Sequence, residues 1–405
     1  MKNAVKRLLL PLCLCLLLAS CGTSGGGGAG GKTAATTETT MDWSTISPPP
    51  EKTAEPTTEP TTDPRPEPTQ NPDGTSTYPL DLFAESVKVY GRSRALTGGI
   101  ACDWTASGIE FRVEAEGAVT VRLVSNAKAY FTLWVDGERQ TERVIAKTGT
   151  NDLVLTTFAA RGVHTVRLLK QTENLNAYCR LASLTFRGDL LDPPAARGRS
   201  IEFYGDSITC GYGNLAPNAS VTDPGGADWQ DGTQTYALLA AETLGADWSM
   251  VAVSGIGVTK GYREVTMPQI WRQGNYRRDA SVYEVARVPD LVVVNLGTND
   301  ETLSADTSQF QKDVTDLIAA VKAQYGQGQK ILFVTGMMKS AYRPYILAAI
   351  EAAGGATSGV YEFRPQQSDN AGPGGHPSLA AQKAVAAELA SYIQSTLFST
   401  WTKLY

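Results

Sequence analysis

Four short polar segments of the 405-residue chain contain the residue types that acyl transfer needs. Ser207 lies in GDSIT, Gly255 in VSGIG, Asn299 in GTND and His376 in GHPS. A serine hydroxyl becomes a nucleophile when an imidazole removes its proton. N–H groups can then stabilise the negative charge that builds on the attacked carbonyl oxygen. Each segment alone is typical of a turn, but together they supply a nucleophile, two oxyanion donors and a base.

Each segment follows or precedes a predicted element of an α/β domain that spans residues 198–400. The hydrophobic patterns predict strands at 201–204, 248–253, 291–295 and 330–335, and helices at 233–244, 308–325, 345–353 and after Ser378. Strands that alternate with helices favour a three-layer α/β fold with a parallel sheet. Ligands bind such sheets beyond the carboxyl ends of the strands, and the polar segments are expected to gather there.

Residues 80–190 predict a separate all-β domain. Apolar and polar residues alternate at 111–116 and at 119–123, and the run YFTLWV leads into an Asp-Gly hairpin turn at 136–137. Short strands at regular spacing suggest a jelly-roll sandwich. We interpret His164, on an apolar strand face, as a hydrogen-bonded structural residue rather than a ligand or base.

The chain begins with the features of an export signal. Residues 1–20 have a cationic start and a short apolar run, which is too short to cross a bilayer. The run ends in LASCG, which looks like a bacterial lipobox and implies cleavage before Cys21 and lipidation of its thiol. We therefore expect a lipoprotein on the extracellular face of a bacterial membrane, held by its acyl chains. An ordinary signal with an incidental cysteine is the alternative.

Residues 21–79 are rich first in glycine and then in threonine, proline and glutamate. Apolar residues are too sparse there to offset the entropy of ordering the chain. We interpret this segment as a disordered stalk, with extended polyproline conformation where proline is frequent.

Composition excludes several classes of function. The net charge of −5 gives no basic surface for nucleic acid, and two histidines are too few for a His-rich metal site. The chain also has no CxxC pair and no cofactor motif, so we expect neither a metal nor a cofactor. Cys102 and Cys179 lie near the two ends of the β domain, and the sequence leaves open whether they form a disulfide.

The four polar segments resemble those of the SGNH, or GDSL-like, hydrolase superfamily. The β domain with CDWTASGIEF and GVHTVRLLKQTE, followed by FYGDSITCGYG, is similar to carbohydrate esterase family 2. The resemblance spans about Val89 to Leu397. It implies an acetyl xylan esterase-like enzyme that removes O-acetyl groups from plant polysaccharides such as xylan or glucomannan, with Ser207 and His376 as its catalytic pair.

One position departs from the superfamily pattern. An aspartate usually stands three residues before the histidine, but Pro373 stands there, and Gly374 occupies the place where many family members keep an acid. The resemblance implies a Ser–His dyad whose imidazole is oriented by a backbone carbonyl. Asp369, folding back toward the imidazole, is the alternative.

The substrate contacts are less defined by sequence. Trp229, Trp271, Tyr342 and Tyr345 lie in predicted loops or helix starts, and the resemblance favours Tyr342 as a sugar-stacking platform. We expect a monomer that binds an acetylated polysaccharide or oligosaccharide. Neither the polysaccharide nor the acetylated position can be read from the sequence.

Two other functions fit the same residues. One is a serine esterase acting on O-acetyl groups of peptidoglycan or on lipid esters. The other is a non-catalytic lipoprotein in which the sandwich binds glycan and the α/β domain serves as a scaffold. Retention of all four chemical residues argues against the second.

Replacement of Ser207 tests directly whether it is the nucleophile. Ser207→Ala is expected to abolish acetate release, because it removes the oxygen that attacks the acetyl carbonyl. Circular dichroism should match that of the wild type. Acetate release by a folded variant at the wild-type rate would contradict the assignment.

Overall fold

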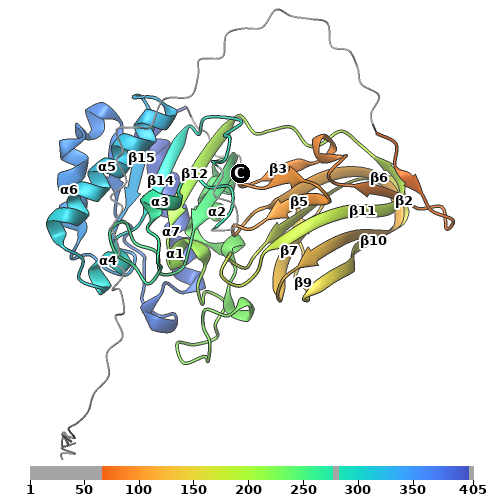
Figure 1. Ribbon diagram of the computed structural model, residues 1–405, viewed down its shortest axis with the longest axis horizontal. Coiled ribbons are helices and arrows are strands. Elements are labelled where there is room, and N and C mark those ends of the chain that lie inside the picture. The colour runs from red at the N-terminus through yellow and green to blue at the C-terminus, as the bar shows by residue number, and fades with distance from the viewer. Residues whose placement is uncertain (1–65, 277–281, 401–405) are drawn as a thin grey trace, which may run out of the picture. The chain divides into compact units, whose positions relative to one another are not determined.

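The computed structural model describes residues 66–276 and 282–400. The predicted signal peptide, Cys21 and most of the predicted stalk lie outside these residues. The described chain forms an antiparallel β domain followed by a parallel α/β domain (Figure 1). None of the helices in the described ranges is long and apolar enough to cross a bilayer.

The β domain is built on three long strands. Its eleven described strands are β1 Thr69–Gln70, β2 Ser76–Pro79, β3 Lys88–Tyr90, β4 Arg94–Leu96, β5 Gly99–Cys102, β6 Gly108–Ser125, β7 Ala129–Val135, β8 Glu138–Arg139, β9 Val144–Ala146, β10 Gly149–Lys170 and β11 Cys179–Leu190. β6 pairs with both β10 and β11, and bulges interrupt both pairings. Bulges bend a sheet, so these long strands can enclose a core.

The predicted start of this domain at residue 80 is wrong. β2 lies before it and pairs with β11, and β1 pairs with β2. Ordered structure therefore already includes residues 69–79, which we had assigned to the stalk. The sequence of β2 is STYP, which is too short and polar to indicate a strand without its neighbour β11.

The β-domain core follows the predicted alternation. Phe111, Val113 and Val121 are buried in one apolar cluster. Asp136 and Gly137 both have positive φ, as the predicted hairpin turn between β7 and β8 requires. His164 has the predicted structural role: its Nδ1 lies 2.8 Å from the Asp136 carboxylate.

Cys102 and Cys179 lie opposite each other in the pairing of β5 with β11, but no disulfide joins them. The Ser93 hydroxyl donates to the Cys102 sulfur at 3.6 Å. The Cys179 sulfur lies 3.3 Å from the Ser125 hydroxyl. The two thiols are thus buried side by side on neighbouring strands.

The α/β domain has the predicted three layers. Its parallel sheet has the strand order β13-β12-β14-β15-β16. The strands are β12 Arg199–Gly205, β13 Ala246–Ala252, β14 Leu291–Asn295, β15 Lys330–Val334 and β16 Val360–Phe363. The helices are α1 Ser207–Cys210, α2 Tyr236–Thr243, α3 Met267–Ile270, α4 Thr298–Thr302, α5 Thr307–Tyr325, α6 Arg343–Ala352 and α7 Leu379–Tyr392. The sequence did not predict β16, which has four residues, the middle two of them only partly buried.

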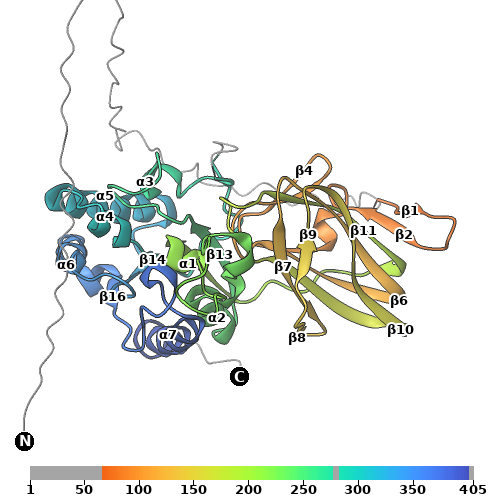
Figure 2. The ribbon, with the colours of Figure 1, turned by 90° about the horizontal axis from the view of Figure 1, so that it is seen from below.

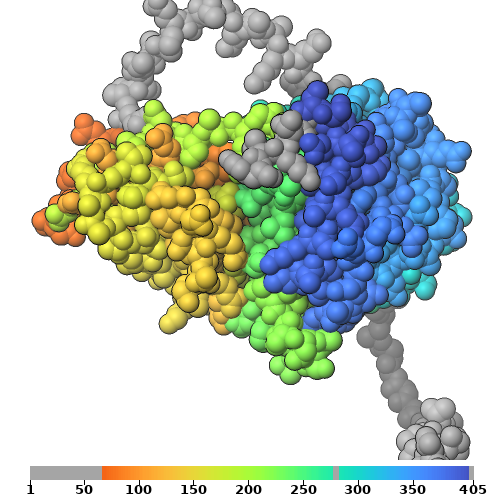
Figure 3. All heavy atoms as spheres, turned by 180° about the vertical axis from the view of Figure 1, so that it is seen from behind, coloured from red at the N-terminus to blue at the C-terminus, as the bar shows by residue number. Residues whose placement is uncertain are grey.

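The helices pack in pairs. α2 contacts α7, and α5 contacts α6 (Figure 2). On the face drawn in Figure 3, the blue C-terminal part of the chain lies directly against the green residues of this domain. Ser378 caps α7 as predicted, because its hydroxyl accepts the N–H of Ala381. This packing brings the C-terminal segment back to β12.

Buried polar contacts join the two domains. Arg92 of the β domain pairs with Glu202 of β12 at 2.6 Å, and both side chains are almost fully buried. The Trp248 indole N–H donates to the Ala106 carbonyl. These contacts fix the sheet of the α/β domain against the β domain.

Neutralising Glu202 should weaken this junction. Glu202→Gln leaves the Arg92 guanidinium buried without its charged partner, which costs about 3 kcal/mol in the free energy of unfolding. Urea unfolding measures the change. An unchanged midpoint would mean that water reaches the guanidinium and compensates the loss.

Candidate active site

A tight strand-to-helix turn presents Ser207. β12 ends at Gly205 and α1 begins at Ser207, with the Asp206 carboxylate accepting the N–H of Ile208 at 3.0 Å. A Cβ on Gly205 would lie 2.0 Å from Thr209 Oγ1, so glycine leaves room for the side chain of Thr209 in α1 to pack against the end of β12. The turn leaves the serine hydroxyl at the carboxyl end of the central strands.

Ser207 and His376 form a dyad. Ser207 Oγ lies 2.7 Å from His376 Nε2, and His376 Nδ1 lies 2.8 Å from the Pro373 carbonyl oxygen. A carbonyl oxygen can only accept, so Nδ1 carries the proton and Nε2 is free to accept the serine proton. The Tyr212 ring stacks on the imidazole with a centroid distance of 4.4 Å, which restricts its rotation.

Asp369 does not orient the histidine. Both of its carboxylate oxygens accept hydrogen bonds from Ser378, one from the backbone N–H and one from the hydroxyl. It therefore stabilises the start of α7, and the alternative assignment of Asp369 to the imidazole is wrong. The expected backbone carbonyl is that of Pro373.

Gly255 and Asn299 flank the nucleophile from two other strand ends. Gly255 follows β13 with a φ of 84°, and a Cβ there would lie 3.0 Å from the Arg263 guanidinium. Asn299 is the second residue of α4, directly after β14. Both residues line the same pocket as Ser207 and His376, so the four predicted residues come together.

Hydrogen bonds fix the Asn299 amide. Its Nδ2 donates to the Ile256 carbonyl at 2.7 Å and lies 3.3 Å from the Asp206 carboxylate. The first contact is short, while the second is long enough to yield to a better acceptor in the pocket. The amide is thus held next to the nucleophile turn before any substrate binds.

Burial shifts two titrating groups of the site. Desolvation lowers the pKa of His376, although the hydrogen bond to Pro373 and the charge of Glu173 oppose the shift. Desolvation also raises the pKa of Asp206 to about 7. The imidazole is therefore neutral at pH 7, as a general base must be.

Asp300 holds the loop that follows Gly255. Its carboxylate accepts the backbone N–H groups of Val258, Thr259 and Lys260 at 2.7–3.0 Å. Consecutive residues of α4 thus have separate roles, because Asn299 faces the pocket and Asp300 anchors the opposite wall. The sequence had indicated only the asparagine.

The pocket around the dyad has a volume of about 400 Å³. Its lining is Ser207, Tyr212, Ser254, Gly255, Tyr262, Arg263, Thr298, Asn299, Thr302, Met338, Lys339, Gly374 and His376. Tyr262 is 58% exposed, so one aromatic surface is open to a ligand. The sequence gave no signal for Tyr262, because its segment lies in a loop without regular structure.

Tyr342 is not the platform that the sequence favoured. Its hydroxyl donates to the Ala305 carbonyl, and its ring packs against Phe310 and Tyr345. It lines a different hollow, behind α4. The prediction is wrong because the loop after β15 turns this ring toward α5 rather than toward Ser207.

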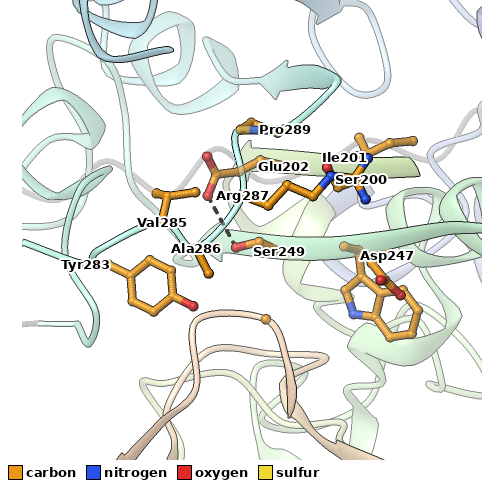
Figure 4. Close-up of a pocket in the computed structure, with 12 residues that line it drawn as sticks. Ser200, Ile201, Glu202, Asp247, Ser249, Tyr283, Val285, Ala286, Arg287 and Pro289 are labelled. Carbon is orange, nitrogen blue, oxygen red and sulfur yellow. Dashed lines mark hydrogen bonds between the residues drawn. The ribbon is translucent and has the colours of Figure 1, made fainter. Parts of the chain in front are cut away.

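A second cavity lies at the other end of the sheet. Figure 4 shows its lining, which includes Ser200, Glu202, Asp247 and Ser249 from the amino-terminal halves of β12 and β13. Its volume is about 130 Å³. Since Ser207 follows the carboxyl end of β12, this cavity is separate from the dyad.

Both domains match known families. Residues 203–394 match the GDSL-like Lipase/Acylhydrolase family, and residues 89–194 match the carbohydrate esterase 2 N-terminal domain. The two matched segments follow one another along the chain and together cover most of both folded domains. The matched segments are those of a carboxylic ester hydrolase, and Ser207, Gly255, Asn299 and His376 all lie within the first match.

Two curated relatives match the chain over part of their own length. The chain is 32% identical over 320 residues to the cellulase/esterase CelE of Acetivibrio thermocellus, covering 74% of this chain and 38% of that protein. It is 30% identical over 192 residues to an acetylxylan esterase / glucomannan deacetylase of Cellvibrio japonicus, covering 45% and 52%. The chain thus spans about half or less of these relatives.

A solved structure matches both domains together. A family two carbohydrate esterase from Clostridium thermocellum in complex with cellohexaose has a TM-score of 0.68 and 26% identity. The match covers 77% of this chain and 99% of that one. The two domains therefore recur as one unit.

Removing the Asn299 amide should slow chemistry rather than binding. Asn299→Ala is expected to lower kcat by about 10²–10³, the usual cost of one lost oxyanion donor. Steady-state kinetics with p-nitrophenyl acetate measure it, with a thermal melt as control. A loss below tenfold would argue against the assigned role.

Acidification should protonate the base. Because burial lowers the pKa of His376 below 6.5, the midpoint of the decline in kcat/KM with falling pH should lie below 6.5. A pH profile with p-nitrophenyl acetate measures the midpoint. A midpoint above 6.5 would contradict the burial of the imidazole.

Proposed function

We propose that this protein is a carbohydrate O-acetylesterase that removes acetyl groups from plant polysaccharides such as xylan or glucomannan. One observation carries the proposal: the hydrogen-bonded pair Ser207 and His376 lines a pocket that Gly255 and Asn299 also line. The matched relatives have esterase names, which supports the same reaction class.

The mechanism follows from the positions of the protons. His376 Nε2 takes the Ser207 proton as the oxygen attacks the acetyl carbonyl, and the sugar hydroxyl leaves with that proton. The backbone N–H groups of Ser207 and Gly255 and the Asn299 amide stabilise the oxyanion. His376 then activates water, which hydrolyses the acetyl-enzyme and restores the dyad.

The pocket lining favours a sugar acetate over a long-chain lipid ester. Met338 is its one aliphatic side chain larger than alanine, whereas hydroxyl, amide and cationic groups supply most of the rest. A long acyl chain would need an extended apolar wall. The exposed Tyr262 ring can stack on the apolar face of a pyranose.

The proposal includes an extracellular location. Residues 1–20 and Cys21 have the pattern of a lipoprotein signal, and a stalk would separate the membrane from the folded domains. We propose a monomer that is anchored by lipid at Cys21. Labelling with a palmitate analogue in a bacterial host should mark the wild type and leave Cys21→Ala unmarked; equal labelling would overturn the anchor.

Substrate panels separate the candidate functions. Acetate release is expected from acetylated xylan or glucomannan, together with faster turnover of p-nitrophenyl acetate than of long-chain esters. Preference for acetylated peptidoglycan or for long-chain esters would favour another serine esterase. No turnover of any ester would leave the glycan-binding lipoprotein.

Replacement of Tyr262 should weaken the binding of a carbohydrate substrate but not that of a small ester. Tyr262→Ala is expected to raise KM for an acetylated oligosaccharide about five- to tenfold, because a stacking surface is worth about 1 kcal/mol. KM for p-nitrophenyl acetate should change little, and Tyr262→Phe should retain the wild-type KM. Equal losses on both substrates would point to a disturbed loop instead.

A further inference from the structure

A buried polar segment of the β domain contacts the catalytic domain. Residues 170–174, at the end of β10 and just beyond it, read KQTEN, and all five are at least 97% buried. The Asn174 amide donates to the Ala252 carbonyl at the end of β13. The two charged side chains of this segment are buried with partners: the Lys170 ammonium donates to the Asp103 and Thr172 carbonyls, and the Glu173 carboxylate accepts two N–H groups.

Glu173 is the acidic residue of that segment, and it lies near both sides of the catalytic machinery. One oxygen accepts the backbone N–H of Ser254 at 2.8 Å. Ser254 directly precedes Gly255. Burial and the nearby negative charge of Glu173 raise the pKa of the Cys210 thiol, and Cys210 is the last residue of the helix that begins with Ser207.

The surroundings of Glu173 require a carboxylate at this position. Its other oxygen accepts the Gln230 side-chain N–H at 2.8 Å. Gln230 cannot turn around, because its own oxygen accepts from Asn176 and its nitrogen also donates to Gly225. Glu173 therefore meets donors at both oxygens, and a glutamine could serve only one of them.

We propose that Glu173 is a positioning residue of the β domain that sets the oxyanion donor Gly255 and the nucleophile helix relative to each other. The inference rests on the esterase function proposed above. It assigns the β domain a part in the chemistry, beyond any contact with glycan. Glu173 touches no substrate, since it lies behind the pocket and outside its lining.

The proposal predicts a specific kinetic change. Glu173→Gln leaves either the Ser254 N–H or the Gln230 N–H without an acceptor, and in both cases the side chain no longer joins Ser254 to Gln230, so the Gly255 backbone is held less firmly. Oxyanion contacts form fully only in the transition state, so kcat should fall at least tenfold while KM stays within twofold.

The pH profile gives a second readout that a structural role would not change. Glu173 contributes a negative charge that raises the pKa of His376. The other titratable or charged side chains near the imidazole are Tyr212, Arg263 and Lys339, which line the pocket, and Asp206 behind Asn299. Removing the Glu173 charge should therefore move the acid limb of kcat/KM to lower pH.

The experiment compares the full-length wild type, Glu173→Gln and Glu202→Gln with p-nitrophenyl acetate. Glu202 is the matched control, because it is also a buried carboxylate at the domain junction but lies in the middle of β12, five residues before Ser207. Glu202→Gln should lose stability and keep the wild-type kcat and acid limb. Glu173→Gln should show the kcat loss and the shifted limb.

The outcomes are distinguishable. A Glu173→Gln kcat within twofold of the wild type, or a loss that Glu202→Gln reproduces at equal melting temperature, would overturn the proposal. If Glu173→Gln does not fold, Glu173→Asp is measured in its place. This variant keeps the negative charge, but its side chain is too short to hold both donors. A wild-type kcat of Glu173→Asp would also overturn the proposal. An inactive wild type would overturn both this proposal and the esterase function.

Discussion

The proposed chemistry depends on one hydrogen bond between residues 169 positions apart, from the Ser207 hydroxyl to the His376 imidazole. β12 brings the serine to the end of the sheet, and the turn before α7 brings the histidine to the same point. Neither group is reactive alone, because the hydroxyl holds its proton at neutral pH and the imidazole has nothing to deprotonate. Gln382 of α7 donates to the Ile208 carbonyl of α1 and accepts the Tyr236 N–H of α2, which holds the start of α7 beside the nucleophile turn.

The imidazole is oriented without an acid. The Pro373 carbonyl fixes the tautomer and the Tyr212 ring limits rotation, while burial keeps the ring neutral. A buried carboxylate at Nδ1 would raise the pKa of the imidazole, whereas a neutral carbonyl orients it at smaller electrostatic cost. This arrangement retains a base that is ready at neutral pH.

The junction of the two domains combines an apolar cluster with buried polar contacts. Arg92 with Glu202, and Glu173 with Ser254 and Gln230, are satisfied only in one relative placement of the domains. Buried polar groups disfavour any other placement of one domain on the other, because a displacement of the domains would leave charges or donors unpaired. The β domain thereby fixes the strand ends from which the catalytic loops begin.

The sequence by itself determined the chemistry and the fold class. Serine, glycine, asparagine and histidine after predicted elements indicated the four site residues, because period and turn chemistry are local properties. Only the tertiary structure decided the contacts between distant segments: Pro373 rather than Asp369 at the imidazole, Tyr262 rather than Tyr342 at the pocket, β2 on β11, and Glu173 behind Gly255. These contacts depend on the direction in which a loop turns and on which neighbour satisfies a buried donor. Neither can be inferred from the local sequence.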